Sequence, residues 1–184
     1  MFSGRKLFLL IVGIGVGSFI GLGLILPETY TAEKAILISA EPSSVFPWIN
    51  ETKKHLEWSP WAASDETLDF RFGRQFAGEG AWYEWESDSS GRGRLILERI
   101  IENKSVAFRL DFNESREAKG LILLQPMGQD TRVVWSFTGQ APNLIGRYLG
   151  LMVNLLAGPL LNDGLIRLKM LAEGKRLIEP GKNL

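Results

Sequence analysis

The sequence offers few side chains that could perform catalysis. It has no cysteine and a single histidine, His55, which excludes thiolate nucleophiles, disulfides and paired-histidine metal sites. His55 lies in the charged segment Lys53–Glu57, which predicts a polar turn, so a general-base role there is possible but unsupported. We therefore predict no metal site, no cofactor and no catalytic residue, and we consider an enzyme the less favoured interpretation.

Two glutamates, Glu84 and Glu86, have a spacing that acid–base chemistry can use. On one face of a strand they would lie roughly 7 Å apart, close to the separation of paired catalytic carboxylates. Tyr83 and Trp85 alternate with them, and aromatic residues belong on the covered face of a half-buried strand. We therefore predict that both carboxylates face water.

Aromatic side chains form the most distinctive set, namely Trp58, Trp61, Trp82, Tyr83, Trp85 and Trp135. They can line a ligand pocket, where ring N–H and O–H groups fix a ligand, or they can pack in the core. Adjacent Trp82 and Tyr83 must point to opposite faces of a strand, which favours core packing for most of the set.

The segment Trp58–Ser59–Pro60–Trp61 carries two of these tryptophans around a stiff turn. Pro60 fixes its own backbone and holds Ser59 extended. The two rings could cover the mouth of a cavity, or they could rest at a bilayer interface, where amphipathic rings are favoured. Both interpretations stay open at this point.

The elements that must position these residues begin with an apolar segment. Residues 7–26 contain fourteen Leu, Ile, Val or Phe, five Gly and one Ser, with no charge. A helix of that length rises about 30 Å, the thickness of a bilayer core. The segment is longer than a signal-peptide core and lacks an A-x-A-like cleavage site, so we predict an uncleaved transmembrane anchor.

Charges around this anchor predict its orientation. Arg5 and Lys6 precede it and Glu28 follows it, so the positive-inside rule places the N-terminus in the cytoplasm and the domain outside. We expect a single-pass protein of the bacterial inner membrane with a periplasmic or extracellular domain. A stripe of small residues raises the possibility of a homodimer in the membrane, through Gly13, Gly17 and Gly21.

Past the anchor, hydrophobic periodicity predicts a sheet and then a helix. Strands are expected at residues 33–39, 67–72, 80–86, 94–102, 105–112, 119–125 and 131–138, several with clean alternation. Pro142 to Arg176 reads as one long apolar helix, which Gly158–Pro159 should kink. The fold class is therefore α+β, with a curled antiparallel sheet closed by a long C-terminal helix.

This order of elements resembles the START-like helix-grip superfamily, and more closely its polyketide cyclase/dehydrase (SRPBCC) branch. The matching strings are SSVFPWIN at 43–50, WSPW at 58–61, GEGAWYEW at 78–85, DTRVVW at 130–135 and GLIRLK at 164–169. The resemblance covers residues 33 to about 173 and implies a cavity between the sheet and the long helix for lipids, sterols or polyketides. It implies no shared catalytic residue.

These observations divide the chain into a cytoplasmic N-terminus (1–6), a transmembrane helix (7–26), a short linker (27–32), the START-like domain (33–176) and a tail (177–184). The linker reaches at most about 20 Å, so the cavity would stay near the lipid surface. The residues expected to line the cavity are Trp58, Trp61, Tyr83, Trp85, Phe108, Leu110, Trp135, Tyr148 and Met152.

Three functions fit this description. The favoured one is a membrane-tethered binding protein for a lipid or another hydrophobic small molecule. The alternatives are a cyclase- or hydrolase-like enzyme acting on an apolar substrate in the same cavity, and a non-catalytic partner of a membrane complex. A formal net charge of zero gives no electrostatic reason to expect a nucleic-acid partner.

Overall fold

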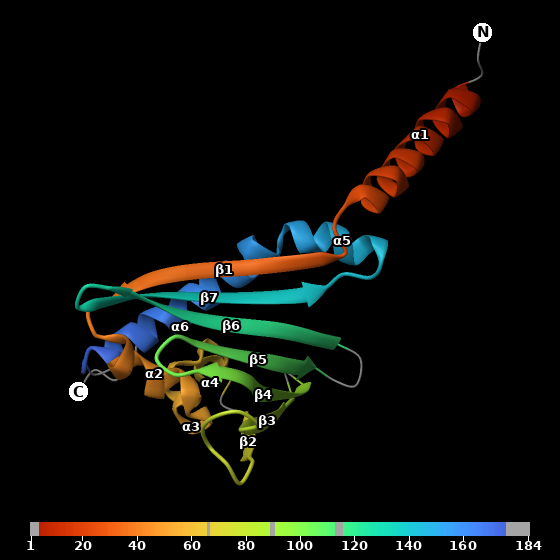
Figure 1. Cartoon of the computed structure of the whole chain (residues 1–184). Coiled ribbons are helices and arrows are strands. Elements are labelled where there is room, and N and C mark those ends of the chain that lie inside the picture. Colours follow the sequence, from red (N-terminus) through yellow and green to blue (C-terminus); the bar gives the residue numbers. More distant parts are fainter. Residues whose placement is uncertain (1–3, 66, 89–90, 113–115, 176–184) are drawn as a thin grey trace, which may run out of the picture.

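A computed structural model describes residues 4–65, 67–88, 91–112 and 116–175. The predicted tail 177–184 and the first three residues of the predicted cytoplasmic segment lie outside these residues. The described chain has a projecting N-terminal helix and one α+β domain (Figure 1). The helices are α1 (Gly4–Ile25), α2 (Pro42–Asn50), α3 (Thr52–Trp58), α4 (Pro60–Ser64), α5 (Leu144–Leu151) and α6 (Val153–Ala172).

Seven antiparallel strands form a single curled sheet. The strands are β1 (Thr29–Ile38), β2 (Asp69–Phe72), β3 (Trp82–Ser87), β4 (Gly91–Ile101), β5 (Ser105–Phe112), β6 (Arg116–Met127) and β7 (Asp130–Gln140), in the spatial order β1-β7-β6-β5-β4-β3-β2. From β2 to β7, strands that are consecutive in the chain are neighbours in the sheet, and β1 pairs with β7 at one edge. The predicted fold class, an α+β fold with an antiparallel sheet and a C-terminal helix, is confirmed.

The first strand begins earlier than predicted. Thr29 pairs with Gln140 and Ala32 pairs with Phe137, so the first residues of β1 extend the sheet where we expected a linker. The β-branched side chains of Thr29 and Thr31 suit an extended backbone. Only residues 26–28 separate α1 from β1.

The C-terminal helix packs across the sheet through one apolar stripe. Leu161, Leu165 and Leu168 have the spacing of a single helix face and are fully buried against the core. α6 contacts β1 most extensively, and it runs behind the sheet in Figure 1.

The helical stretch predicted from Pro142 is divided at Met152, which corrects the prediction of one continuous helix. α6 runs through Pro159 without ending, whereas α5 and α6 are inclined to each other by 51°. The two helices have different partners: α5 packs on α1 and on β1, whereas α6 packs on β1, β7 and the helices α2, α3 and α4.

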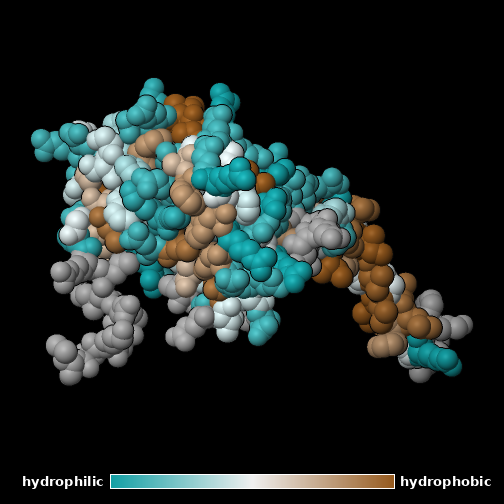
Figure 2. All heavy atoms as spheres, turned by 90° about the horizontal axis from the view of Figure 1, so that it is seen from below, coloured by the Kyte–Doolittle hydropathy of each residue, from teal (hydrophilic) through white to brown (hydrophobic). Residues whose placement is uncertain are grey.

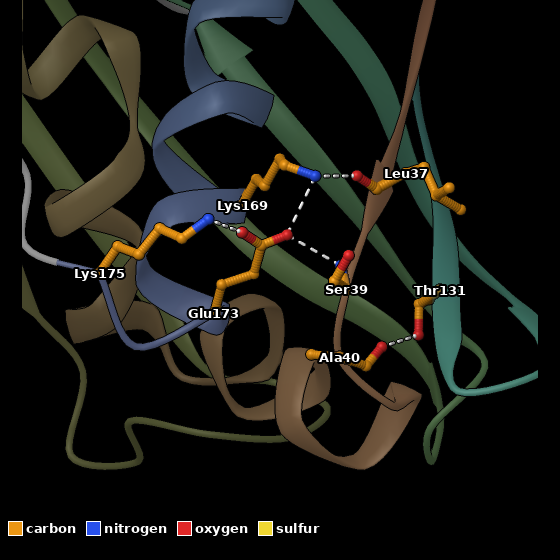
Figure 3. A network of polar contacts seen from close by, with 7 residues as sticks. All are labelled: Leu37, Ser39, Ala40, Thr131, Lys169, Glu173 and Lys175. Atoms are coloured by element: carbon orange, nitrogen blue, oxygen red, sulfur yellow. Dashed lines mark hydrogen bonds and ion pairs between the residues drawn. The ribbon is translucent and has the colours of Figure 1, made fainter.

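Polar contacts fasten the last turn of α6 to the end of β1 (Figure 3). Glu173 accepts hydrogen bonds from the Ser39 backbone N–H at 2.8 Å and from the ammonium groups of Lys169 and Lys175. Lys169 also donates to the Leu37 carbonyl at 2.5 Å. Hydrogen bonds from Lys175, Ser39 and Lys169 lower the pKa of Glu173 to about 2, because they favour the ionised carboxylate.

Candidate ligand cavity

A cavity of about 280 Å³ lies between the sheet and the helices α3 and α4. Sixteen residues line it, and nine of them are Phe, Tyr or Trp. Its volume is near the lower end of the range for small-molecule sites, and such sites are usually apolar with a few polar atoms. Trp61 and Phe112 line the cavity and are also exposed, so the cavity reaches the surface beside them.

Seven of the nine residues proposed from the sequence lie around this cavity. They are Trp58, Trp61, Tyr83, Trp85, Phe108, Leu110 and Trp135. The alternation of β3, β5 and β7 places their aromatic and leucine side chains on the same face of the sheet, where α3 and α4 cover them.

Tyr148 and Met152 do not line the cavity, and the sequence prediction for them is wrong. Tyr148 belongs to α5 and contacts Phe19 of α1, while Met152 lies at the bend and is exposed. The sequence predicted a cavity against the C-terminal helix. The observed lining comes from α3, α4, the residues beside them and the strands, and it includes none of the described residues of α6.

Glycines on neighbouring strands leave space for the large rings. A Cβ at Gly120 would lie 2.1 Å from the ring of Phe108, and a Cβ at Gly93 would lie 2.1 Å from the indole of Trp85. Glycine inside a strand often marks such a close approach. These two glycines therefore let the rings of β3 and β5 lie against the sheet at the cavity wall.

His55 lies on a buried face of the helix α3, in the cavity wall, which corrects the prediction of a polar turn. It shares one buried face of α3 with Thr52 and Trp58. Its ring contacts Trp58 and Tyr83 edge to face, and Nε2 lies 2.8 Å from the Ile49 carbonyl. The spacing of three residues between Thr52, His55 and Trp58 was a signal of this buried face that the flanking charges concealed.

Burial controls the ionisation of both titratable residues in the lining. It lowers the pKa of His55 to about 4, against a smaller opposing effect of the hydrogen bond to Ile49. Burial also raises the pKa of Tyr83 above its ordinary value. Both side chains are therefore neutral near pH 7. Since the Ile49 carbonyl can only accept, His55 Nε2 carries the proton and Nδ1 carries the lone pair.

Two buried indoles differ in their hydrogen bonding. Trp58 Nε1 donates to the Trp48 carbonyl at 2.8 Å. Trp135 Nε1 is buried and has no hydrogen-bond partner among the residues that the structure describes. A buried donor without a partner is unfavourable by about 1–3 kcal/mol, so an acceptor atom on a bound molecule would stabilise this position.

The segment Trp58–Ser59–Pro60–Trp61 is divided between interior and surface. Trp58 is 3% exposed and lies in the core, which excludes it from a bilayer interface. Trp61 is 41% exposed and contacts Trp135 and Phe137 edge to face. Only Trp61 therefore lies where a cavity mouth could be covered.

The glutamate pair lies outside the cavity. Glu84 forms an ion pair with Arg94, and Glu86 forms one with Arg92 at 2.5 Å, on the face of β3 opposite Tyr83. This arrangement agrees with the prediction that both carboxylates face water. Among the described residues, no group of three or more His, Cys, Asp or Glu side chains is placed to hold a metal ion.

The N-terminal helix projects from the domain as an apolar rod (Figure 2). Leu7–Ile25 is long and apolar enough to cross a membrane. The small-residue stripe faces open space, because a Cβ at Gly13, Gly17 or Gly21 would meet nothing within 4 Å.

Comparison with known proteins identifies the fold. No protein-family model and no curated protein matches the chain. A protein of unknown function from Staphylococcus aureus has a TM-score of 0.61 at 11% identity, over 80% of this chain and 96% of that protein. A protein from Arthrobacter aurescens has a TM-score of 0.60 at 12% identity, over 84% and 94% of the two chains.

A third similar structure belongs to a protein of a biosynthetic locus. DynU16, a protein of the dynemicin biosynthetic locus, has a TM-score of 0.56 at 14% identity, over 79% of this chain and 48% of that chain. At these identities the similarities show the fold alone. That fold is an α+β domain with a curled antiparallel sheet and a C-terminal helix, and it is compatible with the helix-grip fold predicted from the sequence.

Proposed function

We propose that this protein is a membrane-tethered binding protein that holds a lipid or another hydrophobic small molecule. The observation that carries the proposal is the aromatic cavity beneath α3 and α4. A cavity lined by Trp, Phe and Leu side chains favours an apolar ligand, because burying apolar surface stabilises a complex by about 25 cal/mol per Å².

The polar atoms of the lining define the rest of the ligand. Trp135 Nε1 offers a donor, and His55 Nδ1 and the Tyr83 hydroxyl add an acceptor and a second donor. All three groups are neutral, so the ligand they suit is uncharged in this part of the molecule. A ketone, ester, phenol or hydroxyl oxygen on an apolar skeleton matches this chemistry.

The tether belongs to the same proposal. α1 would span the bacterial inner membrane with Arg5 and Lys6 in the cytoplasm, which places the domain outside the cytoplasm. The short connection of residues 26–28 would keep the cavity next to the bilayer. A protein built in this way can exchange hydrophobic molecules with the membrane that holds it.

One observation favours a second candidate, an enzyme acting on an apolar substrate in the same cavity. His55 is a titratable group that faces the cavity, and its Nδ1 lone pair could accept a proton. A pKa near 4 makes it a weak base at neutral pH, since general bases work best with a pKa near the operating pH. The cavity therefore supports binding better than proton transfer.

Native mass spectrometry of the full chain in detergent tests the proposal. We expect a co-purified hydrophobic molecule at one copy per protein. The matched variants replace a leucine by tryptophan inside and outside the cavity: Leu110→Trp fills the cavity, and Leu37→Trp adds the same ring at an exposed position of β1.

The outcome depends on the contrast between the two variants. Binding of one molecule by the wild type and by Leu37→Trp, with loss of that molecule from a folded Leu110→Trp, supports the cavity. Equal amounts of bound lipid in all three proteins would mean that lipid adheres to α1 alone and would overturn the proposal. Turnover of the bound molecule by the wild type would favour the enzyme instead.

A further inference from the structure

A second apolar surface lies beside α1, away from the cavity. It is formed by large side chains of α5 and of the beginning of α6 that are each 46–70% exposed, and we call it the apolar arm. Its members are Ile145, Leu149, Leu151, Met152, Leu155 and Leu156. The fifteen residues from Tyr148 to Asn162 carry no charge. An apolar surface of this kind usually marks a contact with a protein or a membrane.

Specific contacts hold the arm against the end of α1. The rings of Tyr148 and Phe19 stack with centroids 4.5 Å apart, and the Tyr148 hydroxyl donates to the Phe19 carbonyl at 2.6 Å. Gly23 allows the close approach, because a Cβ there would lie 2.8 Å from Leu144. Figure 1 shows α5 at the junction between α1 and the sheet.

Arg147 completes this junction by capping α1. Its guanidinium donates to the carbonyls of Gly23, Leu24 and Leu26 at 3.2–3.4 Å and forms an ion pair with Glu28 at 2.5 Å. The last carbonyls of a helix have no partners within the helix, and a cation is favoured at that end. The side chain of Arg147 is only 12% exposed, so the joint is closed on this side.

The contact between Tyr148 and Phe19 indicates how deep the arm would lie in a bilayer that α1 crosses. Phe19 lies six residues before the end of α1, which corresponds to about 9 Å along the helix. With α1 across the bilayer, Tyr148 therefore lies below the level at which α1 leaves the hydrocarbon. Interfacial helices bury their apolar faces to a depth of about 5–10 Å, which matches this level.

We propose that the apolar arm inserts into the outer leaflet of the same bilayer, as an interfacial element beside α1. This inference rests on the proposed membrane tether. The occupant is lipid because the arm continues the lipid-facing surface of α1 at the depth fixed by Phe19 and Tyr148. The arm does not cross the bilayer, since Leu161, Leu165 and Leu168 of α6 are buried in the domain core.

Single cysteines provide the test, because the chain contains none. The full chain, reconstituted in phosphatidylcholine/phosphatidylglycerol vesicles, carries an environment-sensitive fluorophore at Leu149→Cys or Leu156→Cys in the arm. Ile14→Cys in the middle of α1 reports the tether. Met127→Cys is the matched exposed control, at the end of β6, where Met127 pairs with Asp130 at the start of β7, about 30 Å along β7 from the end near α5. Lipids with a quenching nitroxide at a shallow or a deep position are then added.

The expected result is strong quenching of both arm labels by the shallow nitroxide, quenching of Ile14→Cys by the deep one, and no quenching at Met127→Cys. Quenching at Ile14→Cys without quenching in the arm would overturn this inference and leave the tether intact. An absence of quenching both in the arm and at Ile14→Cys would overturn the tether as well. Arm labels that become quenched only when the protein is diluted with lipid would show that a second copy covers the arm, which also overturns the inference.

Discussion

Protonation of His55 should destabilise the folded domain as the pH falls. Burial lowers the folded pKa of His55 from 6.5 to about 4, so the unfolded chain binds the proton more readily at intermediate pH. The free energy of unfolding therefore rises with pH wherever the unfolded chain holds more protons. This contribution is present at pH 7 and is lost as the pH falls from about 6.5 to about 4.

The size of the effect follows from the two pKa values. Proton linkage with values of 6.5 and about 4 gives a loss of about 2 kcal/mol between pH 7 and pH 5. For a chain of this size, that loss corresponds to a fall of about 4–8 °C in the melting temperature. Glu173 has a separate window, because its folded pKa of about 2 lies below its ordinary value of 4.5.

The matched variant is His55→Gln, whose side-chain amide can still donate to the Ile49 carbonyl and does not titrate. Thermal melting of the full chain in one detergent, at pH 7 and pH 5, gives the difference between the two proteins at each pH. We expect the melting temperature of His55→Gln, measured relative to the wild type, to be about 4–8 °C higher at pH 5 than at pH 7. An unchanged difference between pH 7 and pH 5 would refute the assignment of His55 as a buried neutral ring.

Three further predictions concern the core, the polar network and the cavity wall. Leu165→Ala should lower the free energy of unfolding by about 2–5 kcal/mol, whereas Ile166→Ala, at a 42% exposed position, should cost much less by denaturant titration. Glu173→Gln should melt at a lower temperature than the wild type at pH 7, and the gap should narrow as the pH falls from 4.5 towards 2, because the carboxylate then loses its charge. Gly120→Ala should displace the Phe108 ring and reduce ligand occupancy in native mass spectrometry.

Different outcomes would contradict these three predictions. Equal costs for Leu165→Ala and Ile166→Ala would mean that α6 does not pack on the sheet through the face containing Leu165. A Glu173→Gln variant with the same pH profile as the wild type would remove the polar network as a source of acid sensitivity. Unchanged occupancy in Gly120→Ala would show that the Phe108 ring does not shape the bound site.

Alternation in the strands made the sheet and most of the cavity wall predictable. In β5, the pattern Val106, Phe108, Leu110 places every second side chain on one face, and the structure buries all three. Because successive side chains of a strand point to opposite faces, covering one face determines which residues are buried. Seven of the nine lining residues proposed from the sequence lie on this face or on α3 and α4 above it.

The helices were less predictable because their partners decide which face is buried. Charged neighbours made the segment around His55 look like a polar turn, although His55 lies on the buried face of α3. Tyr148 and Met152 look like core residues by composition, but α5 packs on α1 and β1 at the end of the sheet, away from the cavity. The bend at Met152 follows Gly150 by two residues, but only Gly158–Pro159 was predicted to break this helical stretch.

If the proposed function holds, the joint between α1 and the domain would affect ligand exchange. A flexible six-residue linker would let the domain take many orientations within about 20 Å of the bilayer. The structure instead joins α1 to β1 through three residues and closes the joint with Arg147 and Tyr148. β1 is hydrogen-bonded along its length to β7, which carries Trp135 at the cavity wall. The joint therefore fixes the direction of the cavity relative to α1, so that exchange with a bilayer would depend on the geometry of α5 and not on the length of a linker.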